Sequence, residues 1–336
     1  MKKCFIGFVI FSLVSCASLS TKNAQSKIYL YGESHGNPID YEEEFEIWSY
    51  LYKQGARDLF VEFSYSGGKL LNEWMKAKDD TILNFIFESL QGTQADNQYH
   101  YNFLKRIKKA CPKTKFYGID VEHQPNSIGE HYLNVLSERG LKESSEYTLV
   151  VENIADGNDW NTKKQIAQGW ENREKVMVKN FTREYDALPS GTTVFGIFGS
   201  LHTGMQHHIP EVKTLAASLI DYYTPKGVLL NPALGFETIN IAGKSYKTEY
   251  FGKILRGGAN GIESLAFYRL VDTTDFADLP YLGDNLPEGN YPVPLQTGDC
   301  FCVVINFVAG ESLKHVYRCD GNTMSGMLNS HLVFNE

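Results

Sequence analysis

Histidines and carboxylates follow or interrupt apolar segments at well-separated places in the chain. Glu33 and His35 follow one of these segments, Glu62 lies within the next, and His202 follows the last. An imidazole that is held by a carboxylate can accept a proton near neutral pH. Residues of these types, brought together, could activate a water molecule for attack on an ester or a similar bond.

Two of the charged residues lie where burial is expected. Glu62 lies in the predicted strand 59–63, and a buried carboxylate is costly unless it is paired. Arg173 falls within the apolar stripe of a helix that we expect over 160–185. An arginine that faces the core needs an acidic partner, and Glu33 and Glu62 are the natural candidates. The alternatives are a purely structural ion pair for Glu62 and an Arg173 that reaches solvent at the helix edge.

Apolar segments alternate with helical patterns through the first two thirds of the chain. We expect strands over 27–32, 59–63, 116–120 and 193–199, helices over 37–54, 67–75, 80–90, 97–110 and 208–223, and a mostly helical stretch over 126–186. This alternation predicts an α/β fold, with a largely parallel central sheet and helices on both of its faces. Ligands bind beyond the carboxyl ends of the strands in such sheets. The polar residues at these ends, Asp120 among them, are therefore expected along one rim.

The pattern changes after Gly227, where short strands, turns and prolines dominate. We interpret this part as antiparallel additions to the edge of the sheet, with a separate C-terminal domain as the alternative. Gly310 and Glu311 suit a two-residue hairpin turn, a register that places Cys302 opposite Cys319. After export these two residues could form a disulfide, and two ordinary thiols are the alternative. The spacing of the other cysteines is not typical of a zinc site.

The first residues are typical of a secretory signal. Lys2 and Lys3 precede an apolar segment over 5–14, which is too short to span a bilayer as a helix. Leu13 to Cys16 (LVSC) resembles the lipobox of bacterial lipoproteins. That resemblance implies cleavage before Cys16 and acylation of the new terminus, whereas an ordinary signal would leave a free cysteine there.

Three segments therefore make up the predicted organisation. We expect a signal peptide over 1–15, a tether over 16–27 and a single α/β domain over 28–336. The lipid anchor would hold the protein at a bacterial membrane in the cell envelope, on the periplasmic or cell-surface side.

Composition argues against two classes of protein. The net charge is −8 and becomes −10 when Lys2 and Lys3 are removed (−8 − 2 = −10). We find no basic tract and no glycine-rich phosphate loop, which argues against a nucleic-acid partner. There is also no Gly-x-Ser-x-Gly motif, which argues against a serine nucleophile, so we interpret Ser34 and Ser200 as structural.

Four short motifs, in order along roughly half of the chain, resemble one superfamily, that of erythromycin esterases, ChaN-like haem-binding lipoproteins and TIKI/TraB-type proteins. They are Gly32 to Pro38 (GESHGNP), Val61 to Ser64 (VEFS), Asn172 to Glu174 with Met177 and Asn180, and Gly199 to Gly204 (GSLHTG). The resemblance implies an esterase-like hydrolase acting on a small molecule. His35 would be the base that activates water, Glu33 would orient it, and His202 would polarise or protonate the substrate. Glu62 and Arg173 would form a charged floor.

The same resemblance leaves two other functions open. TIKI-type proteins are described as metal-dependent proteases, and His35, His202 and Glu62 could provide three ligands to a divalent metal. ChaN-like proteins bind haem for iron uptake, and the single residue between Glu33 and His35 is nearer to that branch. Tyrosine and histidine can bind haem iron, but no residue is singled out as a ligand. The cofactor therefore stays open between none, a divalent metal and haem, and a purely structural role is a third alternative.

Overall fold

The computed structural model describes residues 25–204, 207–283, 285–287, 296–324 and 327–336. Four of its strands lie where the sequence predicts them, to within about one residue at either end. A fifth, very short strand completes a sheet of parallel strands in the order β3-β2-β4-β1-β5. The strands are β1 (Lys27–Glu33), β2 (Asp58–Ser64), β3 (Lys115–Asp120), β4 (Thr193–Gly199) and β5 (Leu229–Leu230). The predicted α/β architecture with a parallel sheet is confirmed.

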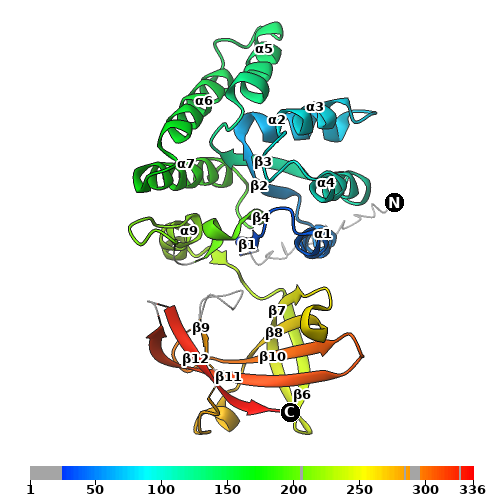
Figure 1. Cartoon of the computed structure of the whole chain (residues 1–336), viewed down its shortest axis with the longest axis vertical. Helices are drawn as coiled ribbons and strands as arrows, with labels where there is room; N and C mark the ends of the chain where they lie inside the picture. The colour runs from blue at the N-terminus through cyan, green and yellow to red at the C-terminus, as the bar shows by residue number, and fades with distance from the viewer. Residues whose placement is uncertain (1–24, 205–206, 284, 288–295, 325–326) are drawn as a thin grey trace, which may run out of the picture.

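Helices cover both faces of this sheet (Figure 1). They are α1 (Pro38–Lys53), α2 (Tyr65–Lys76), α3 (Thr81–Ser89), α4 (Gln98–Ala110), α5 (Glu130–Glu138), α6 (Ser145–Lys163), α7 (Ala167–Asp186), α8 (Ser200–Thr203) and α9 (Leu215–Tyr223). Successive residues of a strand point to opposite faces. Leu59 and Val61 of β2 accordingly pack in one cluster with Trp48 of α1. Phe60 packs in another with Phe181 of α7, with the ring centroids 4.4 Å apart.

The helix predicted over 160–185 is two helices, because the chain turns between Lys163 and Ala167. Ile166 has extended backbone angles there and is 55% exposed, although it lies within the range predicted as one helix. Gly169 passes so close to Lys163 that an added Cβ would lie 2.2 Å from the Lys163 carbonyl oxygen. The contact brings the start of α7 against the end of α6.

The C-terminal strands form a second sheet with antiparallel pairing in the order β6-β7-β8-β10-β11-β12-β9. They are β6 (Gly235–Ile241), β7 (Lys244–Leu255), β8 (Ile262–Leu270), β9 (Asn285–Pro287), β10 (Cys300–Phe307), β11 (Ser312–Met324) and β12 (Met327–Asn335). The antiparallel pairing is as predicted, but the addition of these strands to the edge of the parallel sheet is wrong. The Asn231 side chain accepts a hydrogen bond from the backbone N–H of Leu30 at 2.7 Å, and Asn231 has a φ of 43°. Asn231 thus ends the pairing beside β1 and turns the chain away.

The register of the hairpin formed by β10 and β11 also differs from the prediction. Cys302 pairs with Val316 rather than with Cys319. The connection is longer than two residues, since the Phe307 N–H donates to the Glu311 carbonyl at 2.9 Å. Cys302 and Val316 belong to one apolar cluster of this sheet and Cys319 belongs to the other. This geometry removes the basis for a disulfide between Cys302 and Cys319.

The predicted signal peptide and Cys16 lie outside the described residues. Of the predicted tether only the end is described, and β1 already begins at Lys27. None of the helices in the described part of the chain is long and apolar enough to cross a membrane.

Candidate functional site

A buried arginine joins the carboxyl ends of β2 and β3. The Arg173 guanidinium of α7 donates through Nη2 to Glu62 Oε1 at 2.7 Å. It also binds Asp120 in a bidentate manner, with Nε 2.9 Å from Oδ1 and Nη2 2.6 Å from Oδ2. Arg173 is 7% exposed and Asp120 is fully buried. Burial alone would raise the pKa of Asp120, but the charge of Arg173 outweighs this effect and holds the pKa below the usual range. Glu62 is the predicted partner of Arg173, whereas Asp120 takes the place that we considered for Glu33.

His35 is held by the strand that precedes it. Its Nδ1 lies 2.6 Å from Glu33 Oε1, and its Nε2 faces Glu62 Oε1 at 3.7 Å. The loop is fixed at its next turn, because Asp40 accepts the backbone N–H of Ser34 at 2.6 Å. The hydrogen bond to Glu33, followed by the interaction with Glu62, raises the pKa of His35 to about 10. Its side chain is 27% exposed, so solvent reaches the imidazole.

His202 faces the same carboxylate oxygen as His35. It lies in α8, the single turn that follows β4, and it is 3% exposed. Its Nδ1 binds Glu174 Oε1, and its Nε2 lies 3.5 Å from Glu62 Oε1. Burial alone would lower the pKa of His202, but the charge of Glu62 and the bond to Glu174 raise it to about 9. Glu174 is itself fixed by the backbone N–H of Leu215, at the start of α9, at 2.6 Å.

Glu62 is therefore the common centre of the site. Its Oε1 faces Arg173 and both imidazoles, and its Oε2 accepts the backbone N–H of Gly199 at 2.5 Å. Burial opposes the charge of Glu62, but His202, His35 and Arg173 outweigh it and hold the pKa well below its usual range. A Cβ at Gly199 would lie 3.0 Å from His35 Nε2 and 3.3 Å from Glu62 Oε2. Only glycine leaves room for this close approach at the end of β4.

The structure thus brings together Glu33, His35, Glu62, Arg173 and His202, which the sequence placed far apart along the chain. It adds Asp120 and Glu174 as the partners that hold Arg173 and His202. Asp120 ends a predicted strand and Glu174 adjoins Arg173. In the sequence, only these two positions could have indicated that Asp120 holds Arg173 and that Glu174 holds His202.

An aromatic wall, made of Trp160, Trp170, His207 and His208, lies beside the arginine. Arg173 Cζ is 5.0 Å from the ring centroid of Trp160 and 6.0 Å from that of Trp170. Trp170 also contacts both imidazoles of the wall, with centroids 5.2 and 5.1 Å apart. Cation–π attraction over these rings stabilises the buried guanidinium. The rings meet edge to face, at 83° between Trp160 and Trp170 and at 90° between Trp170 and His208, and they form an apolar side of the site.

His207 supplies a donor to this wall. Its Nδ1 accepts the backbone N–H of Ile209 at 3.1 Å. Burial, and then the neighbouring His208, lower the pKa of His207 to about 4, so the ring is neutral at physiological pH. The proton of a neutral ring whose Nδ1 accepts must be on Nε2. That Nε2 is buried, and no group in the described part of the chain bonds to it.

The predicted metal set is not formed. Among the described residues, no group of three histidine, cysteine or acidic side chains has a metal-binding geometry. The reason is that Arg173 lies 2.7 Å from the Glu62 oxygen that the imidazoles also face. Both ring nitrogens of each imidazole face carboxylate oxygens, with Nε2 of His35 at 3.7 Å and Nε2 of His202 at 3.5 Å from Glu62 Oε1.

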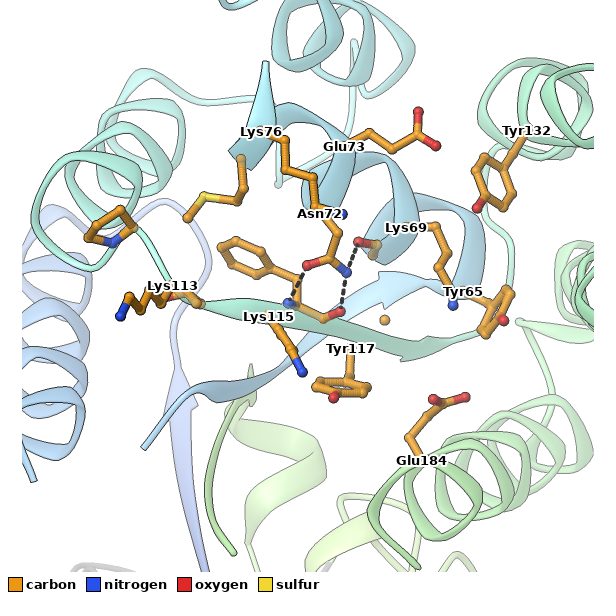
Figure 2. Close-up of a pocket in the computed structure, with 16 residues that line it drawn as sticks. Tyr65, Lys69, Asn72, Glu73, Lys76, Lys113, Lys115, Tyr117, Tyr132 and Glu184 are labelled. Atoms are coloured by element: carbon orange, nitrogen blue, oxygen red, sulfur yellow. Dashed lines mark hydrogen bonds between the residues drawn. The ribbon is translucent and has the colours of Figure 1, made fainter. Parts of the chain in front are cut away.

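A separate hollow of about 500 Å³ lies at the outer edge of β3 (Figure 2). The Asn72 amide bonds both backbone groups of Phe116 there, at 2.8 and 2.7 Å, so this edge does not accept another strand. Lys69, Lys113 and Lys115 line the hollow, but their side chains extend in different directions (Figure 2). The hollow shares no lining residue with the site around Glu62.

No protein-family model matches the chain, and no curated protein matches its sequence. Among solved structures, a Bacillus cereus protein is 12% identical and covers 91% of this chain and 85% of its own, with a TM-score of 0.45. A mutant of the erythromycin esterase EreC in its open conformation is 10% identical and covers 73% and 82%, with a TM-score of 0.45. ChaN of Campylobacter jejuni, solved with cofacial haem, is 14% identical and covers 62% and 80%, with a TM-score of 0.32. The last two belong to groups that the sequence motifs resemble. At these TM-scores the likeness carries no functional argument, so function is inferred from the site itself.

Proposed function

We propose that the protein is a hydrolase of small ester-like substrates that activates water with His35. The observation that carries this proposal is one buried carboxylate, Glu62, faced by two imidazoles whose other nitrogens are each bound to a further carboxylate. A histidine oriented through Nδ1 by an acid presents Nε2 for proton transfer. This arrangement occurs at both His35 and His202. One of the two imidazoles can therefore accept a proton while the other donates one.

The reaction would divide the two protons between these groups. Neutral His35 accepts a proton at Nε2 from water as the water oxygen bonds to the substrate carbonyl carbon. Protonated His202 donates its Nε2 proton to the leaving alkoxide as the carbon–oxygen bond breaks. Glu62 lies between the two rings, 3.7 Å from one Nε2 and 3.5 Å from the other, so the excess proton can return across it.

The charge that develops on the carbonyl oxygen needs donors that are already in place. The unbonded Nε2–H of His207 is one such donor, and the Arg173 charge is another contribution. The aromatic wall would pack against the apolar part of the substrate and exclude water from that side. These features support a substrate that combines a carbonyl group with a ring or a hydrocarbon group.

The raised pKa of His35 sets a condition on this chemistry. With a pKa of about 10, the free protein carries His35 mainly as imidazolium at neutral pH. Only the neutral fraction can act as the base, so the rate should rise with pH until His202, whose pKa is about 9, has lost the proton that it must donate. The same charge would favour binding of a carbonyl oxygen or an anionic group before the proton is lost.

A panel of aryl and alkyl esters tests the proposal with the purified protein. The parent should hydrolyse at least one ester, and His35→Ala should lower its kcat/KM by about 10²- to 10⁴-fold, the usual contribution of a general base. His131→Ala is the matched control, because His131 is exposed on α5. Equal activity of the parent and His35→Ala would overturn the assignment of the base.

We also propose that Cys16 anchors the protein to a bacterial membrane. The support is the Leu-Val-Ser-Cys sequence that follows a positively charged and apolar leader. A lipid anchor with more than one acyl chain gives stable attachment, since a single chain is marginal. The hydrolase would then act at the cell envelope.

A further inference from the structure

A carboxyl group without a hydrogen-bond partner interacts with the carboxylate that holds His35. Glu44 of α1 is fully buried, and neither of its oxygens has a hydrogen-bond partner in the described part of the chain. Glu33 Oε2 also lacks a hydrogen-bond partner in the described part of the chain, although Glu33 Oε1 binds His35. A buried, unpaired carboxylate is costly, so three unpartnered oxygens in one place require an explanation.

The titratable neighbours do not provide the missing partner. Those that interact with Glu44 or Glu33 are Tyr31, Glu33 and His35 from β1 and its loop, Asp40, Tyr41 and Glu43 from α1, and His100 from α4. The Tyr31 hydroxyl already donates to Glu43 at 3.0 Å. None of the ion pairs in the described residues joins a lysine or arginine to Glu44 or Glu33. The charge at this place is therefore not balanced by a second cation.

We propose that Glu44 is protonated and donates its O–H to the free Oε2 of Glu33, which makes Glu44 a positioning residue for His35. Two carboxylate oxygens that face each other are both acceptors and form no hydrogen bond until one of them carries a proton. One proton then gives Glu33 a donor on each side, from Glu44 at Oε2 and from His35 at Oε1. Like charges in close contact do not ionise together, so the pair holds one negative charge.

The electrostatics of the site agree with this arrangement. Burial, and then the charge of Glu33, raise the pKa of Glu44 well above its usual range. Glu33 keeps the negative charge because it has the His35 imidazole as its partner, at 2.6 Å. Glu44 thereby fixes the orientation of Glu33 and, through it, that of the ring. The role of Glu44 in catalysis depends on the proposed function of His35 as the base. The protonation of Glu44 does not depend on it.

Infrared difference spectroscopy at neutral pH tests for the proton directly. The spectrum of the parent minus that of Glu44→Gln should contain the carbonyl band of a protonated carboxylic acid, which a merely buried carboxylate would not give. Glu42→Gln is the matched control on the same helix, because Glu42 is exposed, and it should yield a carboxylate band instead. A carboxylate band in the Glu44 difference spectrum would overturn the proposal.

The pH dependence of unfolding is the second readout. Glu44 is ionised in the unfolded chain above about pH 4.3, whereas it keeps its proton in the folded protein. The parent therefore loses stability as pH rises through this window, and its unfolding constant should increase about tenfold more per pH unit than that of Glu44→Gln. Equal pH slopes for the two proteins would contradict the shared proton.

A further measurement uses the parent alone, in case Glu44→Gln does not fold. In protein labelled with ¹³C at the glutamate carboxyl carbons, one resonance should stay at the protonated position above neutral pH. Glu43, whose pKa burial raises to about 7, should titrate instead. If every glutamate resonance of the folded parent moves to the ionised position by neutral pH, Glu44 is not protonated. None of these readouts contains a substrate, so failure of the proposed hydrolysis would leave them unaffected.

Discussion

Replacement of Arg173 by methionine should be among the most destabilising single changes in the parallel-sheet part of the protein. The substitution keeps much of the side-chain length but leaves Asp120, which is fully buried, and Glu62, which is 12% exposed at its side chain, without the guanidinium between them. Removal of one partner from a buried ion pair costs about 3–5 kcal/mol, because the remaining charge stays buried. Proteins of this kind are stable by only about 5–15 kcal/mol, so a large fraction of the stability is lost.

The loss should also depend on pH in a defined direction. Arg173 is the strongest of the groups that hold the pKa of Asp120 below its usual range. A lowered carboxyl pKa contributes stability that is present above the unfolded value, near pH 3.9, and is lost as pH falls through the folded value. The free energy of unfolding of the parent should therefore exceed that of Arg173→Met most clearly at neutral pH, and this difference should shrink in acid.

Urea unfolding followed by circular dichroism measures this difference, with the midpoint expected to shift at an unchanged slope. Arg139→Met is the control, because Arg139 forms an exposed pair with Glu73 at 2.7 Å and should cost about 0–1 kcal/mol. Asp120→Asn in the Arg173→Met background should restore part of the stability by removing one uncompensated charge. If Arg173→Met costs no more than Arg139→Met, the buried charge network does not have the role assigned to it.

Three further changes test separate parts of the account. Glu174→Gln should lower the pKa of His202 from about 9, since it replaces a charged partner by a neutral one, and NMR titration of the imidazole would show an unchanged value if Glu174 had no such role. Gly199→Ala should lower ester hydrolysis at least tenfold with little loss of secondary structure, because its Cβ would lie 3.0 Å from His35 Nε2; full activity would show that this close approach is not needed. Labelled palmitate should enter the parent and not Cys16→Ala, and equal labelling of both would exclude Cys16 as the acylated residue.

The parallel sheet could be predicted because its strands are short apolar runs separated by helices, a pattern that is local in sequence. Glu62 stood out because a carboxylate in such a run contradicts its surroundings, and Arg173 stood out because it interrupts an apolar stripe. Both anomalies marked residues that pair with each other across 111 positions of the chain. A residue that violates a local pattern is thus a useful sign of a buried polar site.

The features that were not predicted depend on tertiary packing. Asp120 is one of several polar residues after β3, and only the path of α7 places Arg173 against it. The hairpin register depends on the length of the connection, and Gly310, with a φ of 88°, fits a longer loop as well as a two-residue turn. Sheet membership of the C-terminal strands depends on Asn231 at the edge of β1, a contact that no sequence periodicity reveals.

The central claim is that His35, held by Glu33, is the base of a site organised around Glu62. The most direct test is the pH profile of ester hydrolysis, as kcat/KM, for the parent and Glu33→Gln. The account predicts a bell-shaped profile for the parent, bounded by the pKa values of about 9 for His202 and about 10 for His35, and a rising limb that moves to lower pH in Glu33→Gln, because the largest cause of the raised His35 pKa is removed. A rise at the same pH in both proteins would contradict the claim.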